Sequence, residues 1–594
     1  MKSRTSCFNK TIFLKNLTRF APAWGLYTVG ALMGLVLLLD SSSKHMASNL
    51  IDAVQILSLI TPCYALLCAL LLFGDLYSAR TCNALHALPL RRETWFFTNV
   101  ISGFVFHLIP TLVLTVLAVP ILAVYCPENS VLAAPIFLLG TNLQFACFFG
   151  LAVLSALCVG SRFAQGVVYS ILNFGSVLLG WLLETLYIPQ FYGVELDYAP
   201  FFYFSPIAQM METSFVHTER LYTEEFVSVA AFEFTPGGNF VYYFIVAAVG
   251  IGLLFLALQL YRRRKLECAG DFLAIRGLEP IFQVIYSLVA GAAFYFLAED
   301  VVGMDTPVFL FVGLLVGWFT GKMLLERTPR VFRLRNILHS GVLMAAVGLS
   351  LVVAALDPFG IVSWIPQGTQ VESVGISTGW YSPRFTYDEI VLTDPEDILQ
   401  VIKMHREAVE FYEEHGSSQF RVETAETIAL RETMTKEQLE NWDRMNFNMS
   451  LTLNYHMHSG RTVSRYYSIW MGDETGQYLR EIFSRPEAIF GSGMTEERFL
   501  EANSLLVLRD TWHGEEIYIH QPEDIRGLYR AIIADCKQGT MAQQWDFHHP
   551  DESLFCISYA GGEAITVFSN AENTLRWLRA YGVDTGAIEE LYGK

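Results

Sequence analysis

The sequence is poor in charged residues: Asp, Glu, Lys and Arg make up 16% of its 594 residues, whereas hydrophobic residues make up 53%. Soluble globular domains carry about 25% charged residues. Basic residues are also in deficit, with 40 Lys and Arg against 58 Asp and Glu and a formal charge of −18. This acidic balance argues against a nucleic acid partner, because phosphate is bound by basic patches.

The sequence contains ten cysteines but no CxxC pair, which excludes a zinc ribbon and indicates no disulfide framework. Several of the cysteines (Cys63, Cys68, Cys147, Cys158) lie inside apolar runs. Cys536 and Cys556 could pair in an extracytoplasmic domain. The sequence favours the alternative, two buried thiols that behave as small hydrophobic residues.

Motifs for nucleotide hydrolysis and serine catalysis are missing or in the wrong context. Residues 317–322 come nearest to a Walker A loop, but the spacing is wrong, Met323 replaces Ser or Thr, and the segment is apolar. Residues 375–379 match GxSxG, which needs a strand before it and a helix after it. The following residues, Trp380 to Pro383, indicate a turn into another strand. We therefore predict no enzyme, no catalytic residue and no bound cofactor in this chain.

A metal site is not predicted either. His456 and His458 can face one side of a strand, with His548 and His549 nearby, but no HExxH occurs and such histidines are far more often surface residues. His107 and Glu184 lie in or near apolar runs, where ionisable residues are functional candidates by default. Glu184 is close to the end of its run and can reach water.

Nine apolar runs are long enough to cross the roughly 30 Å hydrocarbon layer of a membrane. They predict a polytopic α-helical membrane protein. The runs are 20–39, 54–74, 96–125, 131–159, 164–186, 240–260, 281–298, 307–325 and 338–356.

The basic residues between these runs predict the orientation, because short cytoplasmic loops are rich in Lys and Arg. Basic residues precede the first run and follow the second, fourth, sixth and eighth runs, which all fall on one side if nine helices are threaded. Acidic residues such as Glu128, Glu195 and Asp300 lie on the other side. We expect a cytoplasmic N-terminus and an extracytoplasmic C-terminus in the cell membrane.

Residues 1–19 predict a short helix at the inner membrane interface, because Phe8, Ile12, Phe13 and Leu17 recur at helical spacing. A helical extension of the first span is an equal alternative. Residues 187–239 form a long aromatic and acidic loop between the fifth and sixth spans. Its aromatic residues are typical of an interfacial anchor, and a binding vestibule is the other interpretation.

Residues 357–594 predict an acidic α+β soluble domain that carries 38 acidic and 19 basic side chains. Asp394-Pro395-Glu396-Asp397 has the features of a helix start. Pro522-Glu523-Asp524-Ile525 repeats residues 395–398, and each copy is preceded by a strand pattern and followed by a helix, a hairpin and a second helix. This order predicts two repeats of a strand–helix–hairpin–helix unit.

The loop between the second and third spans, residues 75–95, is predicted to contain a short helix stopped by Pro89. Leu85 and Leu88 would be exposed on it between basic flanks, which is typical of a segment that docks into a groove on a partner. Considered without a resemblance, an ordinary helix resting on lipid headgroups is the more common explanation.

At this loop the chain resembles the permease subunit of a bacterial type-2 ABC transporter, the exporter-like class. Such permeases carry an acidic residue after the second span, a Thr-containing helix and a Leu-Pro turn with basic residues. The matching positions are Asp75, Thr81, Leu88, Pro89, Arg91 and Arg92, and Asp75 stands where Glu is more usual. Arg80 and Leu85 complete the predicted ATPase-coupling set in this loop. Residues 260–270 resemble a second signature of tyrosine, a basic run, Glu and Ala-Gly, with Arg262, Arg263, Arg264, Glu267 and Gly270.

The C-terminal part resembles an uncharacterised domain fused to such permeases in Gram-positive bacteria. Its cues are the helix start at residues 394–398 and the pattern Gly460-Arg461 followed by Arg465-Tyr466-Tyr467. Residues 20–260 would be the six-helix permease core, residues 261–356 three additional spans and residues 357–594 the extracytoplasmic domain. The three additional spans and the outer domain depart from the usual six-span family.

The resemblance implies a non-enzymatic membrane subunit that moves a substrate with ATP hydrolysed by a separate ABC ATPase subunit. Loop 75–95 would be the ATPase-coupling element, and a second permease subunit, identical or a sibling, would complete the complex. Two other classes stay open. One is a membrane sensor whose outer domain binds a peptide or cell-wall ligand, and the other is a membrane enzyme that acts on lipids or wall precursors.

Overall fold

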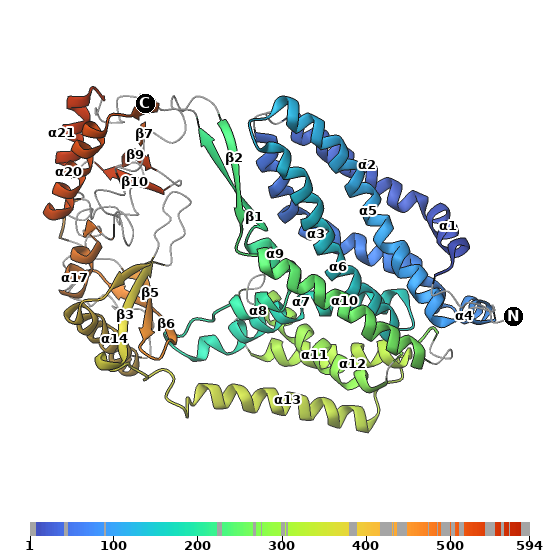
Figure 1. The fold of residues 1–594 in the computed structure, drawn as a ribbon. Helices are drawn as coiled ribbons and strands as arrows, with labels where there is room; N and C mark the ends of the chain where they lie inside the picture. Colours follow the sequence, from blue (N-terminus) through green and yellow to red (C-terminus); the bar gives the residue numbers. More distant parts are fainter. Residues whose placement is uncertain are drawn as a thin grey trace. The chain divides into compact units, whose positions relative to one another are not determined.

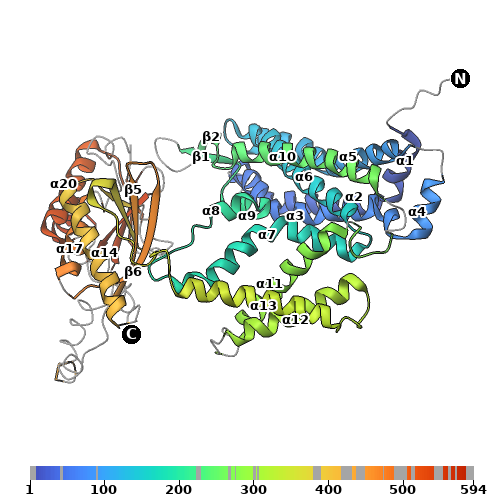
Figure 2. The same cartoon turned by 90° about the horizontal axis from the view of Figure 1, so that it is seen from below.

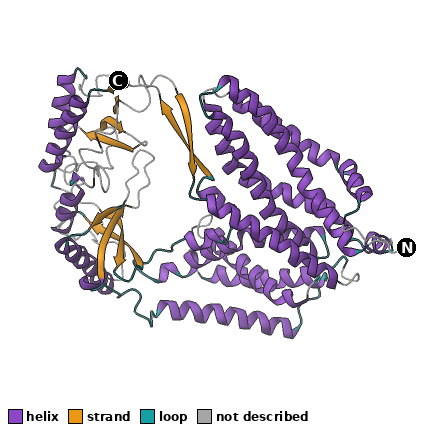
Figure 3. Ribbon diagram, viewed as in Figure 1, coloured by secondary structure: helices purple, strands orange, loops and turns teal. Residues whose placement is uncertain are grey.

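The computed structural model describes residues 8–40, 45–87, 91–222, 229–264, 269–274, 276–298, 303, 307–378, 389–415, 431, 433–435, 448–472, 474–483, 485–486, 488, 499, 505–509, 516–540, 553–559, 563–568 and 571–583. The chain divides into two compact units. Unit 1 comprises Met1–Tyr187 and Leu196–Val352, and unit 2 comprises Ile188–Glu195 and Val353–Lys594. Unit 1 is mainly helical, whereas unit 2 combines helices with small antiparallel sheets (Figure 1 and Figure 3).

Unit 1 is a bundle of long apolar helices with a few short helices at their ends (Figure 1). Its helices are α1 (Lys10–Arg19), α2 (Ala21–Asp40), α3 (Met46–Leu72), α4 (Ala79–His86), α5 (Arg92–Tyr125), α6 (Ala133–Cys158), α7 (Arg162–Leu186), α8 (Ala199–Tyr203), α9 (Pro206–Glu212), α10 (Phe240–Arg263), α11 (Glu279–Phe296), α12 (Val308–Glu326) and α13 (Leu334–Ala355).

Eight helices in the described part of the chain are long and apolar enough to cross a membrane: α3, α5, α6, α7, α10, α11, α12 and α13. They correspond to eight of the nine predicted runs. The remaining run forms α2, whose apolar stretch, Ala21–Val36, is shorter than the others. The structure therefore supports a polytopic helical protein with eight candidate spans and one shorter apolar helix.

Helix α5 continues through Pro110, which cannot donate a backbone hydrogen bond to the carbonyl of Phe106 four residues earlier. The Tyr64 hydroxyl on α3 donates to this carbonyl at 2.9 Å. A backbone group left open inside an apolar bundle needs such a partner. This contact explains how proline is accommodated inside α5 and fixes α3 against it.

Two helix pairs of unit 1 approach closely at glycines. A Cβ atom on Gly150 of α6 would lie 2.2 Å from the carbonyl oxygen of Gly250 on α10. On α12, Gly313, Gly317 and Gly321 all face α11, and a Cβ on Gly317 would lie 2.5 Å from the Cβ of Ala290. Figure 2 shows α11 and α12 side by side, as Figure 1 does. Small residues permit this close backbone packing in membrane bundles, so residues 317–322 belong to a helix contact.

Helix α1 is a separate helix, because the chain leaves helical geometry at Phe20 before α2 begins. The Asn9 side chain caps it by accepting hydrogen bonds from the N–H groups of Thr11 and Ile12. Asn16 donates to Asn99 of α5 at 2.8 Å. Helix α1 is therefore not a helical extension of α2, which was the other interpretation of residues 1–19.

At one end of unit 1, a β-hairpin of β1 (Val216–Tyr222) and β2 (Val229–Pro236) joins connections that are distant in sequence. Glu128, between α5 and α6, donates its N–H to the carbonyl of Ala230 at 3.3 Å and accepts from the N–H of Phe232 at 3.1 Å. Arg220 donates to the Ser48 hydroxyl at the start of α3 at 3.3 Å. The α2–α3, α5–α6 and α7–α10 connections thus meet at this end.

The described residues of unit 2 form two four-stranded antiparallel sheets. The first has the strand order β4-β3-β5-β6, formed by β3 (Val371–Thr378), β4 (Ile390–Leu392), β5 (Asn448–Met457) and β6 (Thr462–Trp470). Alternate residues of β5 are buried, as the period of two predicts. They pack with the apolar residues of α14 (Pro395–His415) and α17 (Glu474–Phe483).

The second sheet has the order β8-β7-β9-β10, formed by β7 (Leu505–Arg509), β8 (Glu516–Ile519), β9 (Ser553–Tyr559) and β10 (Glu563–Phe568), with α20 (Pro522–Gln538) and α21 (Glu572–Tyr581). In each sheet, the first and third strands in chain order are the two central strands. The two halves share the order hairpin–helix–hairpin–helix, which agrees with the predicted repeat except that two strands, not one, precede each first helix.

Unit 2 also includes Ile188–Glu195, which the sequence assigns to the loop after the fifth span. Its 3-10 helix, Ile188–Gln190, follows α7 almost directly. Tyr192 packs on the core of the first sheet, and the carbonyl of Gly193 accepts from the N–H of Tyr466 in β6 at 3.0 Å. This short segment is therefore a structural part of the domain that is formed mainly by residues after 353.

Candidate functional site

The two connections that carry the predicted site residues meet at one end of unit 1. Arg92, the first residue of α5, donates to the carbonyls of Tyr261, Arg262 and Arg264 at 3.2, 3.1 and 3.3 Å. These carbonyls lie at the C-terminal end of α10, where the last four have no partner within the helix. The guanidinium supplies several donors in a fixed plane and a positive charge that suits a helix C-terminus.

Arg264 extends this contact to a third helix. It donates to the carbonyls of Ala156 and Leu157 at the end of α6, at 3.1 and 3.0 Å. Its other terminal nitrogen donates to the carbonyl of Leu76 at 3.4 Å, in the 3-10 turn Gly74–Tyr77 that precedes α4. The Arg264 side chain thus ties α10, α6 and the α3–α5 connection together.

Backbone contacts fix the next part of the α10–α11 connection. Gly270 donates to the carbonyl of Gly160 at 2.8 Å, and Ala274 donates to the carbonyl of Cys158 at 2.8 Å. Gly270 has a φ of +100°, a conformation that suits glycine. The α3–α5, α6–α7 and α10–α11 connections therefore form one hydrogen-bonded assembly, which we call the basal platform (residues 74–78, 91–93, 156–162, 261–264 and 269–274).

An ion pair joins α10 to α5 at the edge of the platform. Arg262 donates its Nε–H to Glu93 at 3.1 Å, and both side chains are substantially exposed, at 46% and 34%. Exposed ion pairs contribute at most about 1 kcal/mol. Glu93 lies in the first turn of α5, where a carboxylate is favoured by the helix dipole.

Helix α4 follows the 3-10 turn Gly74–Tyr77 of this platform directly in the chain. The Thr81 hydroxyl lies 2.9 Å from the carbonyl of Asp75 and 3.1 Å from that of Ser78, to either of which it can donate. Cys82 is buried at 2% exposure, and burial raises the pKa of its thiol. Arg80, Asn83 and Ala84 are exposed. One side of α4 thus buries Cys82, and the other side exposes Arg80, Asn83 and Ala84.

The predicted site residues separate into three groups. Arg92, Arg262, Arg264 and Gly270 hold the platform together, and the backbone carbonyl of Asp75 supports Thr81. Arg80, Arg91 and Arg263 are exposed. The Leu85 side chain and residues Leu88, Pro89 and Glu267 lie outside the described part of the chain.

The main contacts that sequence reasoning missed involve backbone carbonyls. The acceptors for Arg92 and Arg264 are carbonyls at helix ends, which leave no trace in residue identity. Glu93 was also missed, although an acidic residue directly after Arg91 and Arg92 in a helix start is a usable signal.

The other candidates give no comparable assembly. Ser377 lies inside β3 opposite Thr452, and not at a strand-to-helix turn, so the GxSxG segment does not form a nucleophile elbow. His456 lies 3.5 Å from Glu389 and 3.1 Å from the Thr462 hydroxyl. Among the described residues no group of three or more His, Cys, Asp or Glu has metal-binding geometry, and His548 and His549 lie outside them.

The two candidates in the spans have different surroundings. His107 is fully buried, with Nδ1 at 3.3 Å from the Asn142 side-chain oxygen and its ring stacked on Phe145 at 4.3 Å. Glu184 lies on an exposed face of α7. The side chain of Cys556 is outside the described part, so the expectation that it and Cys536 are two buried thiols, not a disulfide, stays a prediction.

Comparison with known proteins adds no assignment: no family model, no curated protein and no solved structure matches the chain. The basal platform, with α4 projecting from it, is therefore the candidate functional site on its own geometry.

Proposed function

We propose that this chain is the membrane-spanning permease subunit of an ATP-binding cassette transporter. ATP is hydrolysed by a separate ATPase subunit, which contacts α4 and the basal platform. A second permease subunit, identical or a sibling, completes the complex in the cell membrane. The transported substrate crosses the bilayer through the helices of unit 1, and this chain needs neither a cofactor nor a nucleic acid.

The observation that carries the proposal is the linkage of α4 to several spans through Arg92 and Arg264. Because Arg264 holds the turn before α4 against the ends of α6 and α10, a force on α4 is passed to these helices. Arg92 joins the start of α5 to the same end of α10. An ATPase can shift a conformational equilibrium only through different contacts in the two states. A seated helix with an exposed face can supply such contacts.

The order of the connections along the chain supports the proposal that each long helix crosses the membrane once. Between the α3–α5 and α10–α11 connections the chain passes through four of them, α5, α6, α7 and α10, and an even number of crossings returns it to the same side. These connections are in contact, as required. At the other end, the α5–α6 connection meets the hairpin after α7, two helices later.

The same argument supports the predicted location of unit 2. Ile188–Glu195 and the residues after 353 belong to one unit, and α10, α11, α12 and α13 lie between them. Four crossings are an even number, which supports one side of the membrane for both parts, and the single crossing of α7 after the α6–α7 connection supports the side away from that connection. With the platform in the cytoplasm, as its basic residues indicate, the C-terminal domain is extracytoplasmic.

The test is co-purification in mild detergent from the native membrane, with the accompanying chains identified by mass spectrometry. The proposal predicts an ATPase with a Walker A motif, and predicts its loss when Leu85 and Leu88 are both changed to Asp. Arg330→Glu is the matched control, because Arg330 is exposed in the connection after α12 on the same predicted side. Retention of the ATPase by the double variant would move the coupling site elsewhere. Absence of any ATPase from the wild-type complex would reject the transporter and favour the sensor.

A further inference from the structure

The motif Arg465-Tyr466-Tyr467 lies in the middle of β6, and the proposed transport mechanism gives it no role. Each of these three consecutive residues contacts a segment that directly follows a long helix in the sequence. The contacts all lie within unit 2, whose segments Ile188–Glu195 and Val353–Lys594 follow α7 and include the end of α13.

Tyr466 and Tyr467 hold the segment after α7. The N–H of Tyr466 donates to the carbonyl of Gly193 at 3.0 Å. The ring of Tyr467 packs directly on Gly193, so that a Cβ atom there would lie 2.2 Å from the ring. Gly193 has a φ of +74°, a left-handed conformation that disfavours any side chain. Two independent features thus require glycine at this position.

The neighbouring residue adds a second anchor for this segment. Tyr192 stacks on Tyr412 of α14 with ring centroids 4.1 Å apart, and its ring meets Tyr467 edge-on at 5.4 Å. The Tyr467 hydroxyl contacts Nε2 of His405 at 2.8 Å, and Nδ1 of His405 contacts the Tyr455 hydroxyl at 3.0 Å. Tyr467 and Tyr455 are fully buried. The segment therefore rests on an ordered part of the domain core.

Arg465 holds the segment after α13. It donates to the carbonyl of Ile361 at 3.0 Å, and its guanidinium lies over the Trp364 ring at 5.2 Å. Arg465 itself is only 7% exposed. The Asp357 carboxylate fixes the turn before it by accepting from the N–H groups of Ile361 and Val362, both at 2.9 Å.

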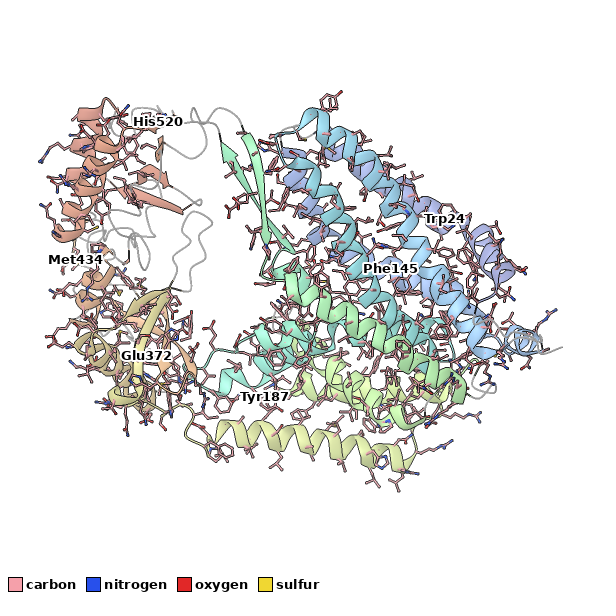
Figure 4. All side chains as sticks on the ribbon, in the orientation of Figure 1. Trp24, Phe145, Tyr187, Glu372, Met434 and His520 are labelled. Carbon is pink, nitrogen blue, oxygen red and sulfur yellow. The ribbon has the colours of Figure 1, made fainter. Side chains whose placement is uncertain are left out.

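Both connections begin with internal hydrogen bonds. After α7, Tyr187 donates to Leu183 and Phe191 donates to Ile188, at 2.9 Å each. In unit 1, the Tyr187 hydroxyl contacts the Ser350 hydroxyl at 2.7 Å, which joins the ends of α7 and α13. Figure 4 labels Tyr187 at the end of α7. After α13, Asp357 donates its N–H to the carbonyl of Ala354 and Gly360 donates to the carbonyl of Asp357, at 3.1 Å each.

We propose that residues 465–467 of β6 form a clamp that binds the connections from α7 and α13 into one cooperative unit with the first sheet. The two connections then open only when the sheet opens. The clamp does not depend on the transport proposal, because it concerns contacts within unit 2 alone.

The test is hydrogen–deuterium exchange of the full chain in lipid nanodiscs over a series of sub-denaturing urea concentrations. Residues that open in one cooperative step share the same urea dependence of exchange. The proposal predicts that the amides of Val194 and Ile361 share the dependence of Tyr466 and Tyr467. Fast exchange of Val194 without urea dependence, beside a protected β6, would overturn the clamp.

Two variants distinguish local release of the clamp from a general loss of stability of the sheet. Gly193→Ala is expected to speed exchange at Val194 at least tenfold and to remove its urea dependence. Gly460→Ala is the matched control. Gly460 has a φ of +78° in the β5–β6 turn, but a Cβ there meets nothing within 4 Å. The Gly460→Ala variant should speed exchange in β6 and at Val194 by the same factor.

If Gly193→Ala does not accumulate, Tyr192→Ala removes the stack on Tyr412 without straining the backbone. It should release the α7 connection with the same loss of shared urea dependence. An unchanged exchange pattern in the variant that folds would contradict the clamp.

Discussion

Arg264→Met gives the sharpest test of the basal platform, because methionine keeps an apolar stem and removes every hydrogen bond from the guanidinium. Arg264 donates to carbonyls of two elements besides its own: the end of α6, at 3.1 and 3.0 Å, and the turn before α4, at 3.4 Å. A hydrogen bond from a charged donor contributes about 1.5–3 kcal/mol. Arg264 is half-buried, so water replaces part of what is lost, and the expected local destabilisation is about 1–3 kcal/mol.

This free energy predicts how much faster the platform opens. Each 1.4 kcal/mol corresponds to about a tenfold change, so the Gly270 and Ala274 amides should exchange about 5- to 150-fold faster. These amides report on the platform because they donate to carbonyls of the α6–α7 turn at 2.8 Å. The assay is hydrogen–deuterium exchange of peptides covering residues 269–274 in nanodiscs.

A neighbouring arginine provides the control. Arg263→Met removes an equal charge from an exposed position one residue away, and it should leave exchange of residues 269–274 unchanged. Arg264→Lys should behave like Arg264→Met in part, because a lysine cannot reach both groups of carbonyls with one ammonium. Equal exchange in the Arg263 and Arg264 variants would refute the argument that Arg264 holds these connections together.

Three further predictions concern packing, pH and a buried carboxylate. Gly150→Ala should lower the yield of folded protein and its thermal stability in detergent, because its Cβ would lie 2.2 Å from the carbonyl of Gly250, whereas Gly252→Ala on α10 meets nothing within 4 Å and should be tolerated. Burial lowers the pKa of His405 from 6.5 to about 3, so only the unfolded chain takes up this proton between those values. The first sheet of unit 2 should therefore lose about 1.4 kcal/mol of stability per pH unit on acidification below 6.5, as measured by the urea dependence of exchange, and His405→Gln should flatten this slope. Asp535→Ala should speed exchange in α21, at a cost of about 2–4 kcal/mol, because the buried carboxylate accepts two N–H groups at the start of that helix; unchanged protection would contradict this.

Hydropathy and alternation predicted much of the secondary structure because both depend on local sequence. The predicted run 240–260 lies within α10, and the hairpin predicted after the first domain helix is formed by β5 and β6. Apolar runs mark spans since the bilayer sets their length, and the period of two marks half-buried strands. The shorter apolar stretch of α2 and the second strand before each domain helix were less visible, because β4 and β8 are only three and four residues long.

The contacts between distant segments were not predictable in the same way. The sequence identified Arg92 and Arg264 as basic residues of two loops, but their partners are carbonyls at helix ends, which every residue possesses. The placement of Gly193 against Tyr467 depends on a fold that brings together residues more than 270 positions apart. The motif at residues 465–467 was visible in the sequence, but its contacts with both membrane connections were not.

The central claim is that α4 contacts a separate ATPase, and site-specific photo-crosslinking tests it most directly. A photoreactive phenylalanine analogue at Ala84, which is exposed on α4, should crosslink in native membranes to a chain with a Walker A motif. The analogue at Arg330, exposed in the connection after α12, should give much less of this product. Crosslinking of Ala84 only to lipid, or equal products from both positions, would contradict the account.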